Sequence, residues 1–363
     1  MDKISWWRIH FGDEEINNVT SAIKNENLSQ GEIAEKFEKN ICSILNTEHV
    51  TVTLSGSIAL LMSLIVIGIK PGDEVIIPNR TWIATANAAL LLGAKVVLVD
   101  VEENKPIIDV NRIEENITKN TKAIIPVHIN GRDANLEKVV KIAKKNHLYV
   151  IEDAAQALYS RNKSGYLGCQ SFCGCFSMSL AKIISTGQGG FIISSDKETY
   201  NKLQFMRTHG VSNLVDAKFD NFGFNFRFPD TLASIGLAQL NRLKEHVERT
   251  KTIYDQYLSG LDDLDDLKLI KVNTEIGEVP IYNEILVNER VKLIDYLAKN
   301  GIETRQFYPN IGSASYIKNN MNYPNSDKFA NDGVYLPSGP GQTDDNIQRV
   351  IDCIRSFYKG GLI

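Results

Sequence analysis

The sequence lacks the marks of a protein that works on nucleic acids or in membranes. Its 363 residues carry a formal net charge of −4, without long runs of one sign. Nucleic-acid binding through phosphate contacts needs a basic face, so this charge pattern argues against that class. The apolar run LLMSLIVIGI is too short to span a bilayer, and MDKISWWRIHFGDEE has no signal-peptide pattern. We expect a cytoplasmic protein that binds neither nucleic acid nor membrane.

Cysteine is scarce as well. The five cysteines are Cys42, Cys169, Cys173, Cys175 and Cys353, an odd number of which three cluster. The cluster has no second cysteine pair and no histidine at ligand spacing beside it. We therefore expect buried free thiols of a reducing compartment, and no metal site.

Short β-branched runs alternate with helical stretches from about residue 50 onward. The runs cover residues 50–54, 74–78, 95–100, 123–129, 148–153 and 189–195. Apolar strands separated by helices predict an α/β fold with a mostly parallel central sheet, covered on both faces. A long amphipathic helix over GLAQLNRLKEHVERTKTIYDQYLSGL then leads to a smaller C-terminal α/β domain. We expect a large domain over residues 1–249 and a small domain over residues 250–363.

Three features lie where predicted strands end, the edge at which such folds bind ligands. Asp153 closes LYVIED, where it can face a ligand or cap the next helix. In TLSGSIAL, the turn at Gly56 and Ser57 offers N–H groups to a phosphate, although its spacing is neither a P-loop nor GxGxxG. Trp82 could stack on a planar ring or belong to the core. Each feature is weak by itself.

Lys182 makes these three features informative as a set. It lies in FSMSLAKIISTGQGG among apolar and small residues. An amine in such surroundings loses its proton more easily and becomes a nucleophile toward carbonyl groups. A phosphate site, an aromatic ring, a strand-end carboxylate and a nucleophilic lysine are together the four groups that pyridoxal phosphate needs.

Several longer blocks make a family resemblance specific. They include SGSIAL, TWIATANAALLLGAKVVLVDV, PVHINGR, IEDAAQAL, GCFSMSLAKIISTGQGG and FNFRFPDTLASIGLAQL. With these blocks the chain resembles, nearly end to end, the sugar aminotransferases of the DegT/DnrJ/EryC1/StrS family, which are fold-type I pyridoxal-phosphate enzymes. The resemblance implies a fold-type I PLP-transferase with pyridoxal 5′-phosphate as cofactor.

The resemblance also implies roles for single residues around the cofactor ring. Lys182 would bind the cofactor covalently and move the proton during transamination. Asp153 would pair with the pyridine nitrogen, Gln156 would contact the ring hydroxyl, and Trp82 would stack on the ring. A branch of the family has histidine in place of the lysine and performs dehydration, so Lys182 favours transamination.

At the phosphate, the resemblance implies contacts from both copies of a homodimer. Gly56, Ser57 and Ser177 would hold the phosphate, and Asn225 would reach it from the neighbouring subunit, so that active sites are shared. His128 and His209 also lie in family blocks, and we interpret both as structural or supporting histidines.

Some positions depart from the family pattern. Gln188 stands where glutamate is common, and Phe226 where tyrosine is frequent. Pro309 is followed by Asn310 and Ile311, whereas many members have a Pro-Leu-His-like segment beside the acceptor pocket. These changes leave the cofactor chemistry in place and leave the identity of the acceptor open.

Two arginines are candidate anchors for an anionic substrate. Arg227 and Arg305 can each bind phosphate or carboxylate through two parallel hydrogen bonds. An ordinary ion pair at a surface or interface is an equally good interpretation of each.

The leading hypothesis is an aminotransferase that moves an amino group from L-glutamate or L-glutamine to the keto group of a nucleotide-linked deoxysugar, for surface polysaccharide or glycan biosynthesis. A small phosphorylated keto compound is the alternative acceptor. A regulatory protein without turnover is a more distant alternative. An NAD-dependent oxidoreductase is disfavoured because no glycine-rich fingerprint follows a first strand.

Overall fold

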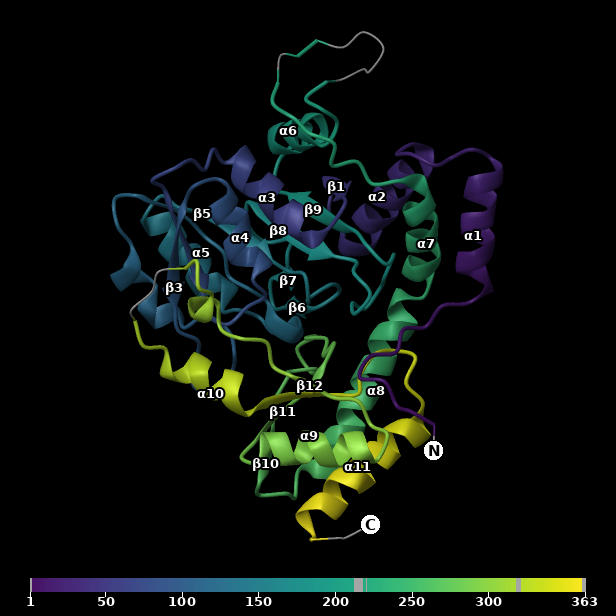
Figure 1. Ribbon diagram of the computed structural model, residues 1–363. Coiled ribbons are helices and arrows are strands. Elements are labelled where there is room, and N and C mark those ends of the chain that lie inside the picture. The colour runs from purple at the N-terminus through teal and green to yellow at the C-terminus, as the bar shows by residue number, and fades with distance from the viewer. Residues whose placement is uncertain (1, 212–217, 220, 318–320, 361–363) are drawn as a thin grey trace.

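A seven-stranded sheet forms the centre of the larger part of the protein (Figure 1). The computed structural model describes residues 2–211, 218–219, 221–317 and 321–360. The strands, in sheet order, are β1 (Val50–Thr53), β9 (Gly190–Ser194), β8 (Cys173–Ser177), β5 (Tyr149–Asp153), β4 (Thr121–Ile124), β2 (Glu74–Pro78) and β3 (Lys95–Val99). Strand β9 runs antiparallel to its two neighbours, β1 and β8, and all other neighbouring strands in this sheet pair in parallel. This confirms the predicted mostly parallel sheet.

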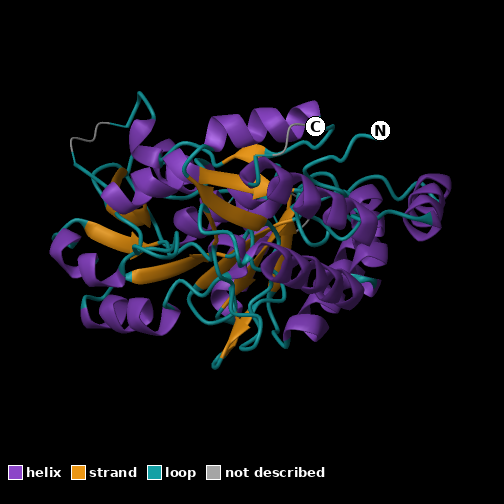
Figure 2. Cartoon of the chain, turned by 90° about the horizontal axis from the view of Figure 1, so that it is seen from below, coloured by secondary structure: helices purple, strands orange, loops and turns teal. Residues whose placement is uncertain are grey.

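Helices cover both faces of this sheet (Figure 2). One face carries α3 (Gly56–Val66), α4 (Ala84–Leu91) and α6 (Lys197–Arg207), and the other carries α2 (Glu32–Leu45), α5 (Leu136–Lys145) and α7 (Asp230–Asn241). Alternation along β2 shows why both faces are apolar. Val75 and Ile77 enter the core under α3 and α4, while Ile76 enters the core under α5.

A second, antiparallel sheet follows in the C-terminal part. Its order is β10 (Leu267–Leu269), β11 (Asn283–Val287), β13 (Gly333–Leu336) and β12 (Arg305–Gln306). Its core is shared with α8 (Leu243–Leu261), α9 (Arg290–Lys299) and α11 (Asp344–Tyr358), while α10 (Pro324–Asp332) contacts β11 and β13. The predicted boundary at residue 250 lies inside α8, and the division into two domains stays a prediction.

The remaining elements are short or peripheral. They are α1 (Asp13–Lys24), the hairpin β6 (Arg161–Asn162) and β7 (Gly165–Tyr166), and the 3-10 helices η1 (Val110–Arg112), η2 (Glu114–Asn116), η3 (Ile129–Gly131) and η4 (Ile311–Ser313). No helix in the described part of the chain is long and apolar enough to cross a membrane.

Two local expectations differ from the structure. The long helix predicted over residues 236–261 is two helices, α7 and α8, because Arg242 between them has ψ near 1°. The Arg242 side chain reaches the carbonyl of His10 and the carboxylate of Glu245 at this break. Strand β8 was not predicted, since Cys173-Gly174-Cys175 has weak strand propensity. Gly174 is required there because an added Cβ would lie 1.8 Å from the Gly168 carbonyl oxygen.

The Asp230 carboxylate joins α7 to the beginning of α2. Its Oδ1 accepts hydrogen bonds from the N–H groups of Gly31 (2.8 Å) and Ala34 (2.9 Å), and its side chain is buried. Asp230→Ala leaves these buried donors without a partner, so we expect the free energy of unfolding to fall by about 2–3 kcal/mol. Urea unfolding measures the change. Asp13→Ala, at the exposed first turn of α1, is the control and is expected to change little; equal losses would contradict this assignment.

Candidate functional site

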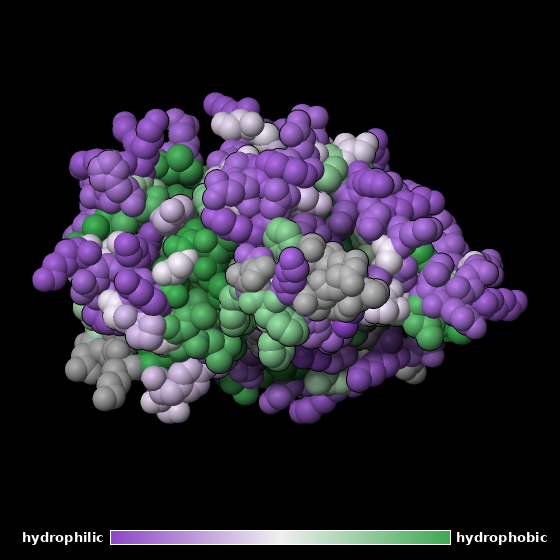
Figure 3. Space-filling view, turned by 90° about the horizontal axis from the view of Figure 1, so that it is seen from above, coloured by the Kyte–Doolittle hydropathy of each residue, from purple (hydrophilic) through white to green (hydrophobic). Residues whose placement is uncertain are grey.

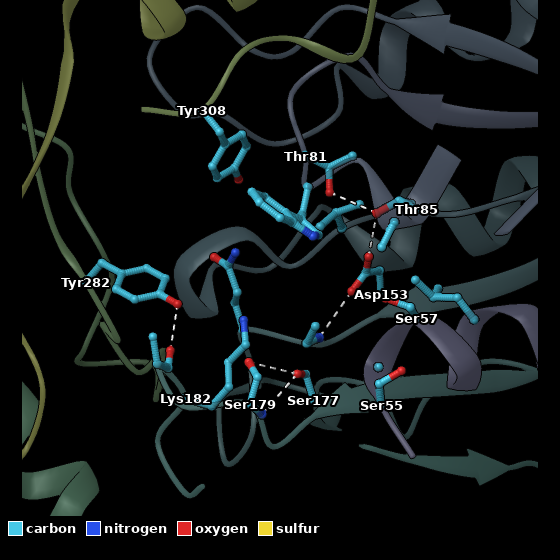
Figure 4. A pocket seen from close by; sticks show the side chains of 18 of the residues that line it. Ser55, Ser57, Thr81, Thr85, Asp153, Ser177, Ser179, Lys182, Tyr282 and Tyr308 are labelled. Atoms are coloured by element: carbon cyan, nitrogen blue, oxygen red, sulfur yellow. Dashed lines mark hydrogen bonds between the residues drawn. The ribbon is translucent and has the colours of Figure 1, made fainter. Parts of the chain in front are cut away.

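A cavity of about 540 Å³ opens where the parallel strands end (Figure 4). Its size lies within the ~300–1,000 Å³ of typical small-molecule sites. Loops after β1, β2, β5 and β8 supply one side, because parallel strands present their carboxyl ends at one edge. The C-terminal part supplies the other side with Tyr282, Arg305, Tyr308 and Tyr335. The cavity therefore brings together residues that are far apart in the sequence.

Lys182 and Asp153 both line this cavity. Lys182 is half-buried, and its burial lowers the pKa of the side-chain amine to about 8, an effect that the Asp153 charge opposes. Asp153 is 5% exposed at the end of β5, and burial raises the pKa of its carboxyl group. A buried carboxylate is stable as an ion only beside hydrogen-bond donors or a cation. Lys182 and Asp153 thus combine an easily deprotonated amine with a buried carboxylate that can bind a cationic group.

Two threonines orient Asp153. Thr85, in the first turn of α4, donates its hydroxyl to Asp153 Oδ2 at 2.7 Å, and its oxygen lies 3.0 Å from the hydroxyl oxygen of Thr81 (Figure 4). The N–H of Ala155 donates to Oδ1 at 3.2 Å. Sequence reasoning missed both threonines, although their spacing of four residues in TWIAT beside the predicted Trp82 was the available signal.

Small residues and hydroxyls gather at one end of the cavity. Ser55 caps α3 by accepting from the N–H of Ile58 at 3.2 Å, so Gly56 and Ser57 provide the first N–H groups of the helix. Gly56 packs against β8 so closely that an added Cβ would lie 2.9 Å from the Cβ of Ser177. The hydroxyl of Ser177 lies 3.3 Å from that of Ser179. A helix N-terminus flanked by hydroxyls is a favourable site for a phosphate.

Aromatic side chains line the rest of the cavity. Trp82 is 58% exposed and meets the edge of the Tyr308 ring, with ring centroids 5.8 Å apart. Tyr282 donates its hydroxyl to the carbonyl of Ala181, next to Lys182, at 2.7 Å (Figure 4). Gln156 also lines the cavity, and its Oε1 accepts from the N–H of Asn130 at 2.9 Å. The exposed face of Trp82 is free to stack on a ligand ring.

The structure places the two other candidate side chains, Asn225 and Arg227, outside the cavity lining of the single chain. They lie on the segment before α7, where Arg227 Nε donates to Asn225 Oδ1 at 3.0 Å. Arg305 does line the cavity, with its guanidinium over the Trp6 ring at 4.6 Å and 3.7 Å from Glu303. Neither Asn225 nor Arg227 lines the cavity of its own chain.

The histidines take no part in the cavity lining. His128 is buried, accepts from the N–H of Ala134 at Nδ1, and lies 3.0 Å from Glu152 through Nε2. The supporting role of His128 stays a prediction. All five cysteines are free, three of them buried and two, Cys42 and Cys169, half-buried.

Residues 10–355 match the DegT/DnrJ/EryC1/StrS aminotransferase family. The chain belongs to this family. It is 32% identical over 334 residues to the GDP-perosamine synthase of Escherichia coli O157:H7, with 91% of each chain covered. It is 34% identical over 338 residues to the GDP-perosamine synthase of Caulobacter vibrioides, with 89% of each covered. Among solved structures, S. venezuelae DesV in complex with a ketimine intermediate superposes with a TM-score of 0.94 at 27% identity, covering 98% of this chain and 99% of that one.

Family membership makes this protein an aminotransferase with pyridoxal 5′-phosphate as its cofactor. The residues present fit that group. The N-terminus of α3 offers N–H donors beside Ser177 to a phosphate, and Gly56 leaves room where a Cβ would collide. The buried carboxylate of Asp153 can pair with a protonated ring nitrogen, and the amine of Lys182 loses its proton at lower pH than an ordinary lysine.

The pKa of Lys182 predicts how the aminotransferase takes up its cofactor. Only the neutral amine attacks an aldehyde, and the neutral fraction grows as pH rises through about 8 instead of the usual 10.5. We expect the rate of covalent attachment of pyridoxal phosphate to the apoprotein to rise through an apparent pKa near 8 and then level off. Stopped-flow absorbance at a series of pH values measures it. A rate that climbs steadily to pH 10 would show that burial does not activate this lysine.

Proposed function

We propose that this aminotransferase moves an amino group from L-glutamate or L-glutamine to the keto group of a nucleotide-linked deoxysugar, for surface polysaccharide or glycan biosynthesis. The observation that carries the proposal is the position of Lys182 and Asp153 in a cavity with aromatic side chains and Arg305 along its lining. The names of two relatives, each a GDP-perosamine synthase, support a nucleotide-linked sugar as the acceptor class.

The chemistry divides between cofactor and protein. Bound pyridoxal phosphate supplies an electron sink for negative charge on the substrate carbon. Lys182 Nζ binds the cofactor and carries the proton that moves during the exchange. Asp153 keeps a positive charge on the ring nitrogen, with its orientation held by Thr85. Trp82 stacks on the ring, Gln156 contacts the ring oxygen, and Gly56, Ser57 and Ser177 hold the phosphate.

A homodimer completes the active site in this proposal, with Asn225 reaching the phosphate in the partner subunit. The exposed position of Asn225 outside its own cavity supports this arrangement. Phe219, Phe222 and Phe224, on the segment that projects beyond α6 (Figure 1), are 61–85% exposed. Figure 3 shows apolar surface in the middle of the face seen from that side. Apolar surface of this kind is commonly buried between subunits.

Arg305 is the proposed contact for the negative charge of the acceptor. It lines the cavity from β12, and its ion pair with Glu303 is long and exposed. We expect Arg305→Ala to raise the KM for a nucleotide-linked acceptor about tenfold, because one charge-assisted hydrogen bond is lost. The half-reaction with the amino donor should keep its rate, which stopped-flow measurement with glutamate alone will show. An unchanged acceptor KM would leave Arg305 as an ordinary surface ion pair.

A screen of the two half-reactions tests the proposed function. Glutamate and glutamine are added separately to the holoenzyme, and loss of the visible cofactor band reports amino transfer to the cofactor. The donor is then removed, and GDP- and dTDP-linked keto-deoxysugars and small keto-phosphates are added one at a time. Return of the band identifies an acceptor.

The screen has three distinguishable results. Recovery with a nucleotide-linked keto-sugar supports the proposal. Recovery with small keto-phosphates alone would move the enzyme to the alternative acceptor. A band that neither glutamate nor glutamine removes would contradict the proposed donors.

A further inference from the structure

The turn at residues 129–132 has an unusual backbone. Asn130 has φ 52° and ψ 40°, and Gly131 has φ 76°, so two successive residues adopt the left-handed region. Asparagine enters that region more easily than most residues but still needs support. Gly131 has no alternative, since an added Cβ would lie 2.0 Å from the carbonyl oxygen of Val279. The turn is therefore fitted tightly against the C-terminal part of the chain.

The side chain of Asn130 is fully buried and clamps the backbone of Tyr282. Its Oδ1 accepts from the N–H of Tyr282 at 2.7 Å, and its Nδ2 donates to the carbonyl of the same residue at 2.8 Å. Nδ2 also donates to Glu284 Oε2 at 2.9 Å, and that carboxylate is paired with the buried Arg132. Because all these groups are buried, each bond is costly to lose.

The backbone of Asn130 acts on the cavity itself. Its N–H donates to Gln156 Oε1, and an N–H can only donate, so this contact fixes which end of the Gln156 amide is oxygen. The NH₂ end is then left for other acceptors in the cavity, which Gln156 lines. Gln156 thus presents donors, and not its oxygen, to whatever lies beside it.

The second target of Asn130 lies beside Lys182. Tyr282, whose backbone is clamped by Asn130, donates its hydroxyl to the carbonyl of Ala181, the residue before Lys182. Asn130 therefore contacts two residues that line the cavity with Lys182: Gln156 through its backbone and Tyr282 through its side chain. Alanine at this position loses the clamp and disfavours the left-handed backbone, whereas glycine loses the clamp alone.

We propose that Asn130 is a positioning residue of this aminotransferase: it orients the Gln156 amide as a donor toward the cofactor ring oxygen and holds Tyr282 against the Lys182 loop. This inference rests on the proposed function, in which Gln156 contacts that ring oxygen. It adds a residue that contacts neither cofactor nor substrate and acts through two that line the cavity.

A spectroscopic pH titration tests the proposal. A donor to the ring oxygen draws negative charge away from the neighbouring nitrogen of Lys182, which then releases its proton at lower pH. Without the donor, the midpoint of the titration of the visible cofactor band moves upward. We expect Gln156→Ala and Asn130→Ala each to raise the midpoint by roughly one pH unit. Asn130→Gly keeps the left-handed backbone and is expected to raise it by less than half as much.

The double variant Asn130→Ala/Gln156→Ala separates positioning from general damage. If Asn130 acts through Gln156, the double variant has the midpoint of Gln156→Ala alone. An unchanged midpoint in Asn130→Ala, or two shifts that add in full, would overturn the proposal. If Asn130→Ala gives no folded holoenzyme, Asn130→Ser replaces it in the same cycle with the same two outcomes. A wild-type protein without a visible band would instead refute the proposed role of Lys182.

Discussion

Lys182→Ala is expected to abolish covalent cofactor binding and to lower the rate of amino transfer by about 10⁴-fold or more. The side chain supplies both the nucleophile for the cofactor and the base that moves the proton, and loss of a proton-transfer group alone costs ~10²–10⁴-fold. The visible cofactor band should be missing after dialysis. Absorbance and the half-reaction with glutamate measure the two effects.

Two control variants make the result specific to this amine. Lys182→Arg keeps a positive charge in the cavity but is no nucleophile at neutral pH, so it should fail like the alanine variant. Lys163→Ala, in the exposed hairpin between β6 and β7, should behave as wild type. Circular dichroism and the melting temperature show whether each variant is folded. A folded Lys182→Ala protein with normal turnover would refute the proposed role of Lys182 and would point to a different lysine.

Asp153→Asn is expected to lower kcat by about 10²–10³-fold while leaving the cofactor attached. The amide has the same shape but cannot balance a positive ring nitrogen, and loss of one preorganised electrostatic group costs about that much. The visible band should remain because Lys182 is unchanged. Steady-state kinetics and absorbance of the same sample separate the two effects.

Asp153→Asn should also lower the pKa of the Lys182 amine. The charge of Asp153 raises the pKa of Lys182 against the effect of burial, so its removal lowers that pKa further. The pH profile of cofactor attachment should move to lower pH in Asp153→Asn. Thr85→Val removes the 2.7 Å hydrogen bond to Asp153, together with the contact to the Thr81 hydroxyl, and leaves the carboxylate charge in place. We expect a smaller loss of kcat, about tenfold. A loss of kcat in Thr85→Val as large as in Asp153→Asn would mean that the charge of the Asp153 carboxylate is not what catalysis depends on.

Much of the fold was predictable because most strands of the central sheet are apolar runs that can be recognised in the sequence. The runs around Val75 and Val150 are continuous and apolar, as a sheet covered on both faces requires. The break at Arg242 was not predictable, because both α7 and α8 have helical periodicity and the interruption depends on contacts with His10. Strand β8 was missed because it contains Gly174, a residue of weak strand propensity. Glycine is needed there because the Gly168 backbone lies against it, a contact that forms only in the folded chain.

Some residues of the cavity could also be predicted from the sequence, and others could not. Lys182, Asp153 and Trp82 stand in distinctive blocks, and the structure brings them into one cavity. Tyr282 and Tyr308 could not be predicted as neighbours of Lys182, because they come from the C-terminal part and approach only after the two sheets pack. Their burial raises the phenol pKa of both tyrosines, a property of the assembled cavity and not of the local sequence.

Chemical mapping of the cofactor lysine tests the central claim most directly. The holoenzyme is treated with borohydride, which makes the bond between lysine and cofactor permanent, and the protein is digested and analysed by peptide mass spectrometry. We predict that the cofactor-derived mass lies on the peptide containing Lys182 and on no other. The same mass on a different lysine, or its absence from every peptide of a protein that shows the visible band, would contradict the account.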